Sequence, residues 1–332
     1  MSKTPNCYSE ILKETSRAFY LSLAVLPKPA REPLSLAYLL ARTADTVADS
    51  SCEETGQRTP TLKQIQLSLH EPQPELAERL ANFHPEKPGE ARLLLEYPGI
   101  VRLVRELEPS LQRSVKQVVT TLVEGMIWDQ ELFHGEGRRS GLKMEELERY
   151  TFLVAGCVGP FWSGVCARSD PRLSTLCQED DMAIEFGKAL QWVNILRDVP
   201  RDQTEGRFYL PPLGTPRFER SFLRAGRRAL VAFAAACEYP LLFPRFYFRH
   251  RLAVFLPLVL GLRTLECLFS SGGPRQGERI KVGRKEVFCW LAAGIAAGLS
   301  DRFLRNLLRQ LRSRTNLALS QLETEFEIPT TS

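Results

Sequence analysis

The chain has 332 residues, of which 44% are hydrophobic and 25% charged, and its formal net charge is +5. This composition is ordinary for a globular protein that can bury a sizeable core. The basic residues are scattered rather than gathered in blocks, which argues against nucleic-acid binding and leaves an anionic substrate or membrane surface compatible. Eight cysteines without Cys-x-x-Cys spacing disfavour zinc and disulfide frameworks.

Apolar residues recur at spacings of three and four along most of the chain, which predicts an all-α protein. Between about 52 and 98 the sequence is polar and rich in proline, so we expect a surface excursion around one short helix. We expect one domain over 1–332, with a tail at about 312–332. The expected helices cover 9–26, 31–48, 99–133, 143–167, 180–197, 218–239, 248–268 and 285–311.

The ends and apolar stretches of the chain bear on its location. The first residues lack the apolar run of a signal peptide, so we expect a cytoplasmic protein. The longest apolar runs fall short of the ~20 residues that a spanning helix needs. The segment 287–311 is apolar and rich in arginine, which allows peripheral contact with the inner membrane face, but a buried core helix is the favoured interpretation.

Two aspartate pairs are the most informative feature of the sequence. Asp45 and Asp49 lie four residues apart, as do Asp198 and Asp202. Nine aspartates in a chain of this length would give such pairs only about 0.2 times by chance. Residues four apart share a helix face, and two carboxylates so placed suit Mg²⁺ that also binds phosphate oxygens. An exposed acidic helix face is the alternative for the first pair taken alone.

Both pairs have arginine and other polar side chains in helical register with them. Tyr38 and Arg42 precede Asp45 on one stripe. Before Asp198, the residues at matching spacing are Gln191 and Asn194, with Arg197 beside them. Carboxylates for a metal next to guanidinium groups predict a site that holds a diphosphate.

The second pair carries an uncertainty in its backbone. Pro200 lies between Asp198 and Asp202, and proline ends or kinks a helix, so Asp202 could lie on the following loop. Arg207 follows in the segment GRFYLP, where it could bind phosphate or cap the loop, with phosphate favoured.

Several segments in order resemble the squalene/phytoene synthases, a family that joins two prenyl diphosphates head to head. The segments, which span most of the first 215 residues, are TSRAFY (15–20), YLLARTADTVAD (38–49), YTFLVAGCVG (150–159), NILRDVPRD (194–202) and GRFYLP (206–211). Two later stretches, 255–269 and 279–287, are more similar to the squalene branch, which uses NADPH. The resemblance implies an isoprenoid-synthase-type helical bundle around a deep central cavity.

The resemblance also implies residue roles. Asp45, Asp49, Asp198 and Asp202 would bind Mg²⁺, and Tyr150 would lie near the leaving group and the reacting carbons. Where eukaryotic members carry an acid just before the second aspartate of the first motif, this chain has Ala48. The diphosphate would be held by Ser16, Arg17, Arg42, Arg197 and Arg207. NADPH phosphate would be bound by Lys281 and Arg284, whose alternative is a solvated basic loop.

Ionising an allylic diphosphate leaves a carbocation, which needs a dry, electron-rich wall. The candidates are Phe19, Tyr20, Tyr38, Phe152 and Trp192. For Phe152 and Trp192 taken singly, core packing is the favoured alternative. Tyr150 could instead be a buried structural hydroxyl. Gly156 and Gly159 permit close backbone approach, for a ligand or for a neighbouring helix.

The resemblance to the squalene branch implies that two farnesyl diphosphates are converted through presqualene diphosphate to squalene with Mg²⁺ and NADPH, and we expect a monomer or weak oligomer. The two aspartate pairs would face each other across the mouth of the cavity. Rival products are phytoene, dehydrosqualene, presqualene diphosphate and hydroxysqualene. A non-catalytic assembly protein of the same fold is a rival from another class, and it has no reason to keep both pairs with their arginines.

Overall fold

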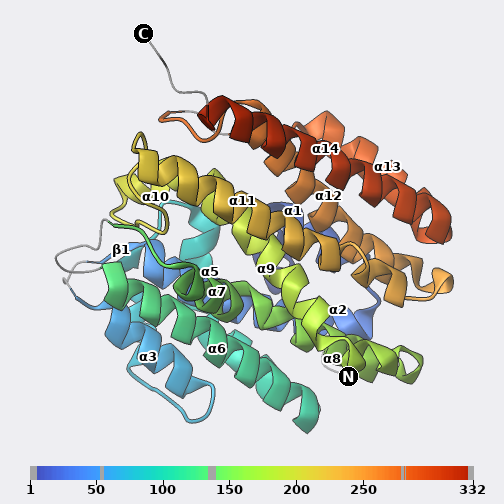
Figure 1. Ribbon diagram of the computed structural model, residues 1–332. Coiled ribbons are helices and arrows are strands. Elements are labelled where there is room, and N and C mark those ends of the chain that lie inside the picture. The colour runs from blue at the N-terminus through green and yellow to red at the C-terminus, as the bar shows by residue number, and fades with distance from the viewer. Residues whose placement is uncertain (1–5, 53–55, 134–139, 278–279, 281, 328–332) are drawn as a thin grey trace. The chain divides into compact units, whose positions relative to one another are not determined.

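The computed structural model describes residues 6–52, 56–133, 140–277, 280 and 282–327, without the side chains of a few helix residues. The chain divides into two compact units. The first comprises residues 1–135 and 160–174, and the second comprises 136–159 and 175–332. The predicted all-α class is confirmed, since the described residues form helices apart from one pair of two-residue strands (Figure 1).

The first unit is a set of helices packed around α2. Helix α2 contacts α1, α3, α5 and α6, and buries a continuous apolar face that includes Leu36, Leu39 and Leu40. Strands β1 (Ser51–Cys52) and β2 (Phe83–His84) pair antiparallel, with Ser51 opposite His84. The helices are α1 (Asn6–Val25), α2 (Lys28–Asp49), α3 (Arg58–Ser68), α4 (Leu76–Ala81), α5 (Pro88–Arg105) and α6 (Pro109–Phe133).

Two expectations for this unit are wrong. The segment 99–133 forms the end of α5 and all of α6 rather than one helix, because Pro109 disfavours a helical residue before it and starts a new helix. The stretch 52–98 holds α3, α4 and most of α5 rather than one short helix. Its apolar residues, including Leu62, Ile65 and Tyr97, are buried, so much of this stretch belongs to the core.

The second unit is built around α9 (Asp180–Arg197), which contacts α7, η1, α11 and α12. Trp192 on α9 is fully buried, as core packing predicted. The other elements are α7 (Met144–Thr151), the π-helix η1 (Phe152–Gly156), α10 (Val199–Thr204), α11 (Pro216–Ala236), the short 3₁₀ helices η3 (Tyr239–Leu242) and η4 (Arg245–Tyr247), α12 (Phe248–Ser270), α13 (Arg284–Leu299) and α14 (Asp301–Glu327). Helix α8 (Val158–Ser169) starts in this unit and continues into the first. The 3₁₀ helix η2 (Pro171–Gln178) starts in the first unit and ends in the second.

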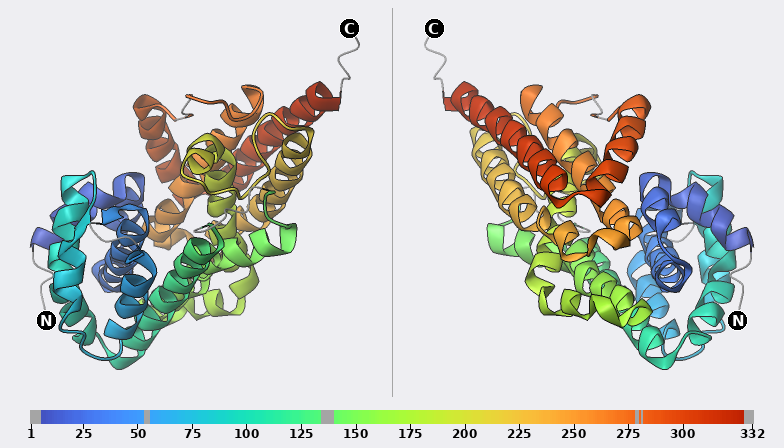
Figure 2. Two further views of the ribbon diagram at one scale, coloured as in Figure 1. Left: turned by 90° about the vertical axis from the view of Figure 1, so that its left-hand side faces the viewer. Right: turned by 90° about the vertical axis from the view of Figure 1, so that its right-hand side faces the viewer.

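The C-terminal part differs from the prediction. The segment 285–311 is two helices, because Ser300 has an extended backbone (φ −140°, ψ 114°) between α13 and α14. Helix α14 runs well into the segment expected to be a tail, and it buries Leu319 and Leu322 there. Helices α12, α13 and α14 pack against one another (Figures 1 and 2).

Two helical stretches, Met144–Ser169 and Arg245–Ser270, are long and apolar enough to span a membrane by length and composition alone. The unbroken apolar runs of the sequence predict no such helix, because they are shorter than these helices, which continue past polar residues. In Arg245–Ser270, 72% of the apolar window is buried inside the protein, as in a core helix. These stretches are therefore weak evidence for membrane insertion.

The start of α8 crosses α9 at backbone contact. A Cβ atom on Gly159 would lie 2.0 Å from the Ala183 carbonyl oxygen, and one on Gly187 would lie 2.3 Å from that of Ala155. A Cβ on Gly156 would press on the Lys188 side chain at 3.0 Å. Within this unit, helix packing therefore accounts for Gly156 and Gly159.

We expect Gly159→Ala to lower the free energy of unfolding by about 2–3 kcal/mol, because the added methyl meets rigid backbone. Urea unfolding measures this. Gly164→Ala on the same helix is the matched control: its methyl meets only the end of the Arg168 side chain, at 3.1 Å, and alanine favours the helix by up to about 1 kcal/mol. Equal stabilities of the two variants would contradict the close crossing.

Candidate functional site

Helix α2 carries the first aspartate pair on the predicted face. The guanidinium of Arg42 binds Asp45 through Nη1, one helical turn along the same helix. Through Nη2 it binds Glu90 on α5. Burial lowers the pKa of Arg42, but the charge of Asp45 and the hydrogen bond to Glu90 outweigh this and raise it. Arg42 is thus a fixed cation beside the carboxylates.

Glu90 is a residue of this site that the sequence did not single out. Its residue is 7% exposed, and its carboxylate accepts hydrogen bonds from Arg42 and from Lys87 Nζ at 2.8 Å. Burial raises the pKa of Glu90, but these two hydrogen bonds outweigh it and lower the pKa below its usual value. No pattern in the sequence marks Glu90, because its contact with Arg42 depends on how α5 packs on α2.

Aromatic rings lie next to the polar face of α2. The ring centroids of Phe19 and Tyr38 are 5.3 Å apart, and those of Phe19 and Trp162 are 6.5 Å apart. The Tyr38 hydroxyl donates to the Thr15 carbonyl at 3.1 Å, and burial raises the pKa of Tyr38 to about 12, so it stays protonated. Phe19 and Tyr38 are therefore adjacent, as the predicted electron-rich wall requires, and the ring of Trp162 lies beside that of Phe19. Ser16, also buried, donates its hydroxyl hydrogen to the Leu12 carbonyl.

The second aspartate pair lies at a break between two helices. Helix α9 ends at Arg197, as the proline predicted, and α10 begins at Val199 with Pro200 in its first turn. Asp202 lies within α10 rather than on a loop. The Asp202 amide donates to the Asp198 carbonyl at 2.9 Å, so the pair keeps its one-turn spacing despite Pro200.

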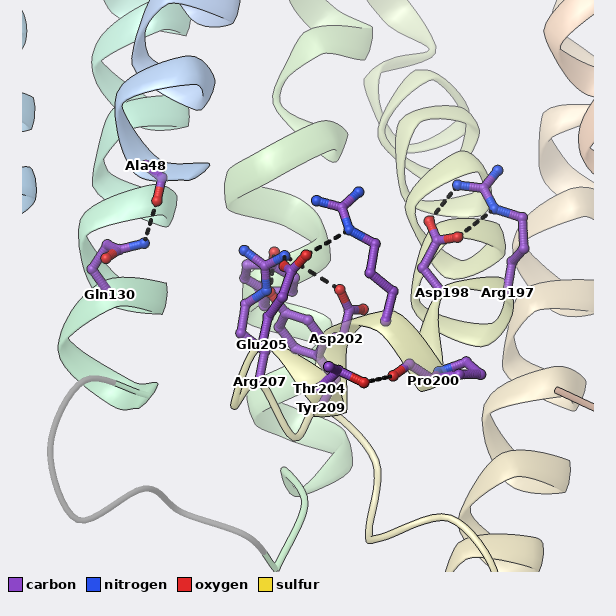
Figure 3. A network of polar contacts seen from close by, with 12 residues as sticks. Ala48, Gln130, Arg197, Asp198, Pro200, Asp202, Thr204, Glu205, Arg207 and Tyr209 are labelled. Atoms are coloured by element: carbon purple, nitrogen blue, oxygen red, sulfur yellow. Dashed lines mark hydrogen bonds and ion pairs between the residues drawn. The ribbon is translucent and has the colours of Figure 1, made fainter. Parts of the chain in front are cut away.

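The polar residues predicted around Asp198 are brought together. Figure 3 shows the contact between Arg197 and Asp198. Arg197 donates to both carboxylate oxygens of Asp198, from Nε at 2.8 Å and from Nη2. Its Nη2 also donates to Asn194 Oδ1 at 3.0 Å, and Asn194 Nδ2 donates to Gln191 Oε1 at 3.2 Å. Four side chains therefore form one polar chain along the end of α9.

Asp202 is a mostly buried carboxyl. Burial raises its pKa to about 7; the positive charge of Arg207 opposes this shift, while Asp198 and Glu205 add to it. Arg207 Nη2 lies 3.4 Å from Asp202 Oδ1 and also binds Glu205 (Figure 3). The Arg207 amide donates to the Asp202 carbonyl at 2.7 Å, beyond a turn where Gly206 has φ +82°. Arg207 thus already has two acidic partners, Asp202 in α10 and Glu205 directly after that helix.

Tyr150 is paired with a second tyrosine that the sequence analysis did not assign. The hydroxyl oxygens of Tyr150 and Tyr209 are 2.9 Å apart, and their buried rings stack at 4.9 Å. Tyr209 lies within the motif GRFYLP, so the motif held the signal. Gln203 holds this segment in place, since its Nε2 donates to the Pro211 carbonyl and its Oε1 accepts from the Leu213 amide, both at 2.9 Å.

A cluster of four charges fixes α7, the helix that carries Tyr150. Glu148 on α7 binds Lys188 of α9 and Arg228 of α11. Arg228 also binds both carboxylate oxygens of Glu185 at 2.8 Å, and Lys188 lies 3.2 Å from Glu185. Two cations and two anions balance inside a partly dry region, where removing one member leaves the others uncompensated.

Among the described side chains, no group of three or more His, Cys, Asp or Glu is placed to hold a metal ion. Mg²⁺ does not require one, because it binds through one or two carboxylates, waters and phosphate oxygens. Each aspartate pair offers two carboxylates within one turn, and a nearby cation would relieve the raised pKa of Asp202. The residues present therefore fit a magnesium ion.

The remaining predictions have varied outcomes. Phe152 is 38% exposed, so the favoured core packing is wrong for it. The side chains of Arg17 and Arg284 and the whole of Lys281 lie outside the described residues. The two aspartate pairs lie in different units, and their approach across one cavity stays a prediction.

The family model described as squalene/phytoene synthase matches residues 12–286. The chain belongs to the squalene/phytoene synthase family.

Curated relatives agree with this assignment. The chain is 29% identical over 209 residues to a squalene synthase of Cyberlindnera jadinii, covering 62% of this chain and 45% of that protein. It is 30% identical over 217 residues to a bifunctional lycopene cyclase/phytoene synthase of Blakeslea trispora, covering 61% and 32%. The match thus spans less than half the length of these relatives.

Solved structures share the fold. A ligand complex of TcSQS superposes with a TM-score of 0.72 at 18% identity, covering 96% of this chain and 98% of that one. Squalene synthase HpnC from Alicyclobacillus acidocaldarius gives a TM-score of 0.52 at 18% identity, covering 77% and 89%. At such identities the likeness concerns the fold alone.

We expect Glu185→Gln to destabilise the protein by about 2–3 kcal/mol at pH 7, because Arg228 and Lys188 lose a charged partner. Burial raises the pKa of Glu185, but the hydrogen bond from Arg228 outweighs it, so the pKa is lowered. A lowered pKa means that the stabilisation is present above the ordinary value and is lost as the pH falls through the folded-state value. The difference from wild type should therefore shrink as the pH falls from about 5 to about 3.

Urea unfolding at several pH values measures this difference. Glu145→Gln, an exposed change on α7, is the control and should shift stability by less than about 0.5 kcal/mol at each pH. A difference for Glu185→Gln that does not vary with pH would contradict the ionic role.

Proposed function

We propose that this protein is a squalene synthase, which condenses two farnesyl diphosphates head to head to presqualene diphosphate and reduces that intermediate with NADPH to squalene. The observation that carries the proposal is the pair of helix ends at which two aspartates lie one turn apart beside an ion-paired arginine, in a member of this family. Squalene synthases among the relatives, from Cyberlindnera jadinii and Schizosaccharomyces pombe, support this activity.

Diphosphate binding would use cations that are already in place. Arg42 and Arg197 each hold the first aspartate of their pair, so a diphosphate would share these guanidinium groups with the carboxylates. Mg²⁺ bound by the aspartate pairs would neutralise the leaving diphosphate. Arg207 and the amides of Gln191 and Asn194 would add donors in the second unit. Ser16 and Arg17 would add donors in the first.

The hydrocarbon side would be shielded by aromatic rings. Loss of diphosphate leaves an allylic cation, which ring faces stabilise where water is excluded. Phe19 and Tyr38 offer such faces next to Arg42, and the raised pKa of Tyr38 keeps its hydroxyl neutral. We place the reacting carbons on this side of the first aspartate pair.

Tyr150 would act close to the leaving group. Its hydroxyl shares a hydrogen bond with Tyr209, so one hydroxyl of the pair donates to the other and the second proton stays available to a ligand. Such a pair can orient a proton donor toward an oxygen of the departing diphosphate. The charges around Glu148 would keep α7, and with it Tyr150, in position.

The reductive step would use NADPH, with Lys281 and Arg284 on its phosphate. A protein of this composition would work in the cytoplasm, as a monomer or weak oligomer, with peripheral contact to the membrane that receives its product.

Phytoene synthesis from C20 substrates is the second candidate, favoured by the 30% identity to the phytoene synthase of Blakeslea trispora. Dehydrosqualene, presqualene diphosphate and hydroxysqualene are further candidate products. They would form if the reaction stopped at the intermediate or ended in a step other than the reduction to squalene.

Purified protein with Mg²⁺ and farnesyl diphosphate should make presqualene diphosphate without NADPH and squalene with it, because hydride is needed only after the first condensation. Gas chromatography and mass spectrometry of the extracted products measure this. Geranylgeranyl diphosphate is the comparison substrate, and phytoene from it at a higher rate would favour the phytoene candidate. If neither substrate is consumed, the proposed function is wrong.

We expect Asp45→Asn and Asp198→Asn each to lower kcat/KM at least about 100-fold, since each removes a charge that would hold the metal against the developing anion. Asp181→Asn on α9 is the matched control: this residue is exposed near the start of the helix, and activity should stay near wild type. Thermal unfolding checks that all three variants fold. Full activity of Asp45→Asn would contradict the metal role of the first aspartate pair.

A further inference from the structure

Exposed apolar side chains gather on one part of the second unit. Eleven large apolar residues are exposed in the described part of the chain, and six of them lie on η4, the start of α12, α13 and the start of α14. We call these six the apolar patch: Phe246, Phe248, Phe288, Ile295, Leu299 and Phe303. Patches of this kind mark interaction sites more often than scattered single residues do.

Helix α13 forms the middle of the apolar patch. Phe288, Ile295 and Leu299 are 70%, 54% and 61% exposed, and their spacing of seven and four places them on one helix face. The opposite face is packed inward, since Cβ atoms on Gly294 and Gly298 would touch Phe255 and Phe248 of α12. No charged residue occurs from Val287 to Leu299. The exposed face is therefore apolar throughout, which explains why composition alone predicted a buried helix.

The rest of the patch is tied to α13 by specific contacts. A Cβ on Gly298 would lie 3.3 Å from that of Phe248, so the end of α13 meets the start of α12. Asp301, at the start of α14, pairs with Arg251 at 2.7 Å and with Arg245 at 3.1 Å. These ion pairs join the start of α14, which carries Phe303, to η4 and the start of α12, which carry Phe246 and Phe248. Figure 2 shows α13 in orange-red next to α12 and α14.

The charges next to the patch are almost all positive. Between Asp301 and Arg314 the sequence has five arginines and a single acid. Arg302 and Arg305 are exposed on either side of Phe303, and Arg245 is exposed beside Phe246. A symmetric contact between two copies of this chain would bring these like charges together, which is unfavourable. An apolar face beside arginines is complementary to anionic lipid headgroups over acyl chains.

We propose that the apolar patch docks this protein on the surface of an anionic membrane. Helix α13 has 16 residues and is too short to cross a bilayer, which needs ~20. It would lie in the interface, with its glycine face on α12 and its apolar face among the lipid chains. The proposal does not rest on the reaction proposed above, because it uses only the exposure and charge of this surface.

The test is sedimentation of the full chain with vesicles of phosphatidylglycerol and phosphatidylcholine, and with vesicles of phosphatidylcholine alone. We expect binding to the mixed vesicles that weakens with salt. Ile295→Glu combined with Leu299→Glu should lower partitioning more than tenfold, because both changes place a carboxylate in the interface. Val231→Glu, an equally exposed apolar position on α11 (63%), is the matched control and should bind like wild type.

A second pair of variants tests the charges without touching the apolar face. Arg302→Gln with Arg305→Gln should weaken partitioning about fivefold for each arginine. Arg220→Gln with Arg224→Gln, exposed on α11, is the control and should bind like wild type. Circular dichroism confirms that each variant folds.

Three results would overturn the proposal. The first is wild-type protein that stays in solution with mixed vesicles. The second is a dimer in analytical ultracentrifugation without lipid that Ile295→Glu dissociates, which would make the patch a subunit interface. The third is vesicle binding by the glutamate variants that equals that of wild type; if these variants also lose product formation, the patch belongs to the reaction.

Discussion

The ion pair between an arginine and the first aspartate of each pair is the interaction on which the candidate site depends. Two carboxylates one turn apart repel each other, and burial makes their charge more costly. Arg42 and Arg197 supply the compensating charge within a helical turn. Because a guanidinium cannot give up its proton, this compensation persists whether or not a ligand is present. The same cations are then ready for a second anion.

Further polar side chains hold these cations in place. Glu90 on α5 binds Nη2 of Arg42, and Asn194, one turn back on α9, accepts a hydrogen bond from Nη2 of Arg197. Each arginine is therefore fixed at two points, which leaves less conformational freedom to lose when an anion binds. Burial of Asp202 exceeds what the charge of Arg207 compensates, so its pKa rises to about 7. A divalent cation nearby would lower this pKa.

The candidate site and the apolar patch lie on different elements and consist of different kinds of side chain. The candidate site lies at helix ends and on the polar stripe of α2, whereas α13 presents an apolar face with arginines beside it. The proposed substrate has an anionic part and a hydrocarbon part. Arg42 and Arg197 offer cations for the first, and the aromatic rings near Arg42 offer an apolar surface for the second. The apolar patch is left for the proposed contact with a membrane.

The sequence by itself determined the helical class, the family, the polar faces of α2 and α9, and the break at Pro200, because helical periodicity, proline geometry and the spacing of carboxylates act within a few residues. Only the tertiary structure decided that 52–98 is largely core, that Glu90 supports Arg42, that Tyr209 stacks on Tyr150, and that one face of α13 stays exposed. Each of these depends on which helix packs against which, and burial of an apolar or charged side chain is a property of that packing rather than of its local sequence.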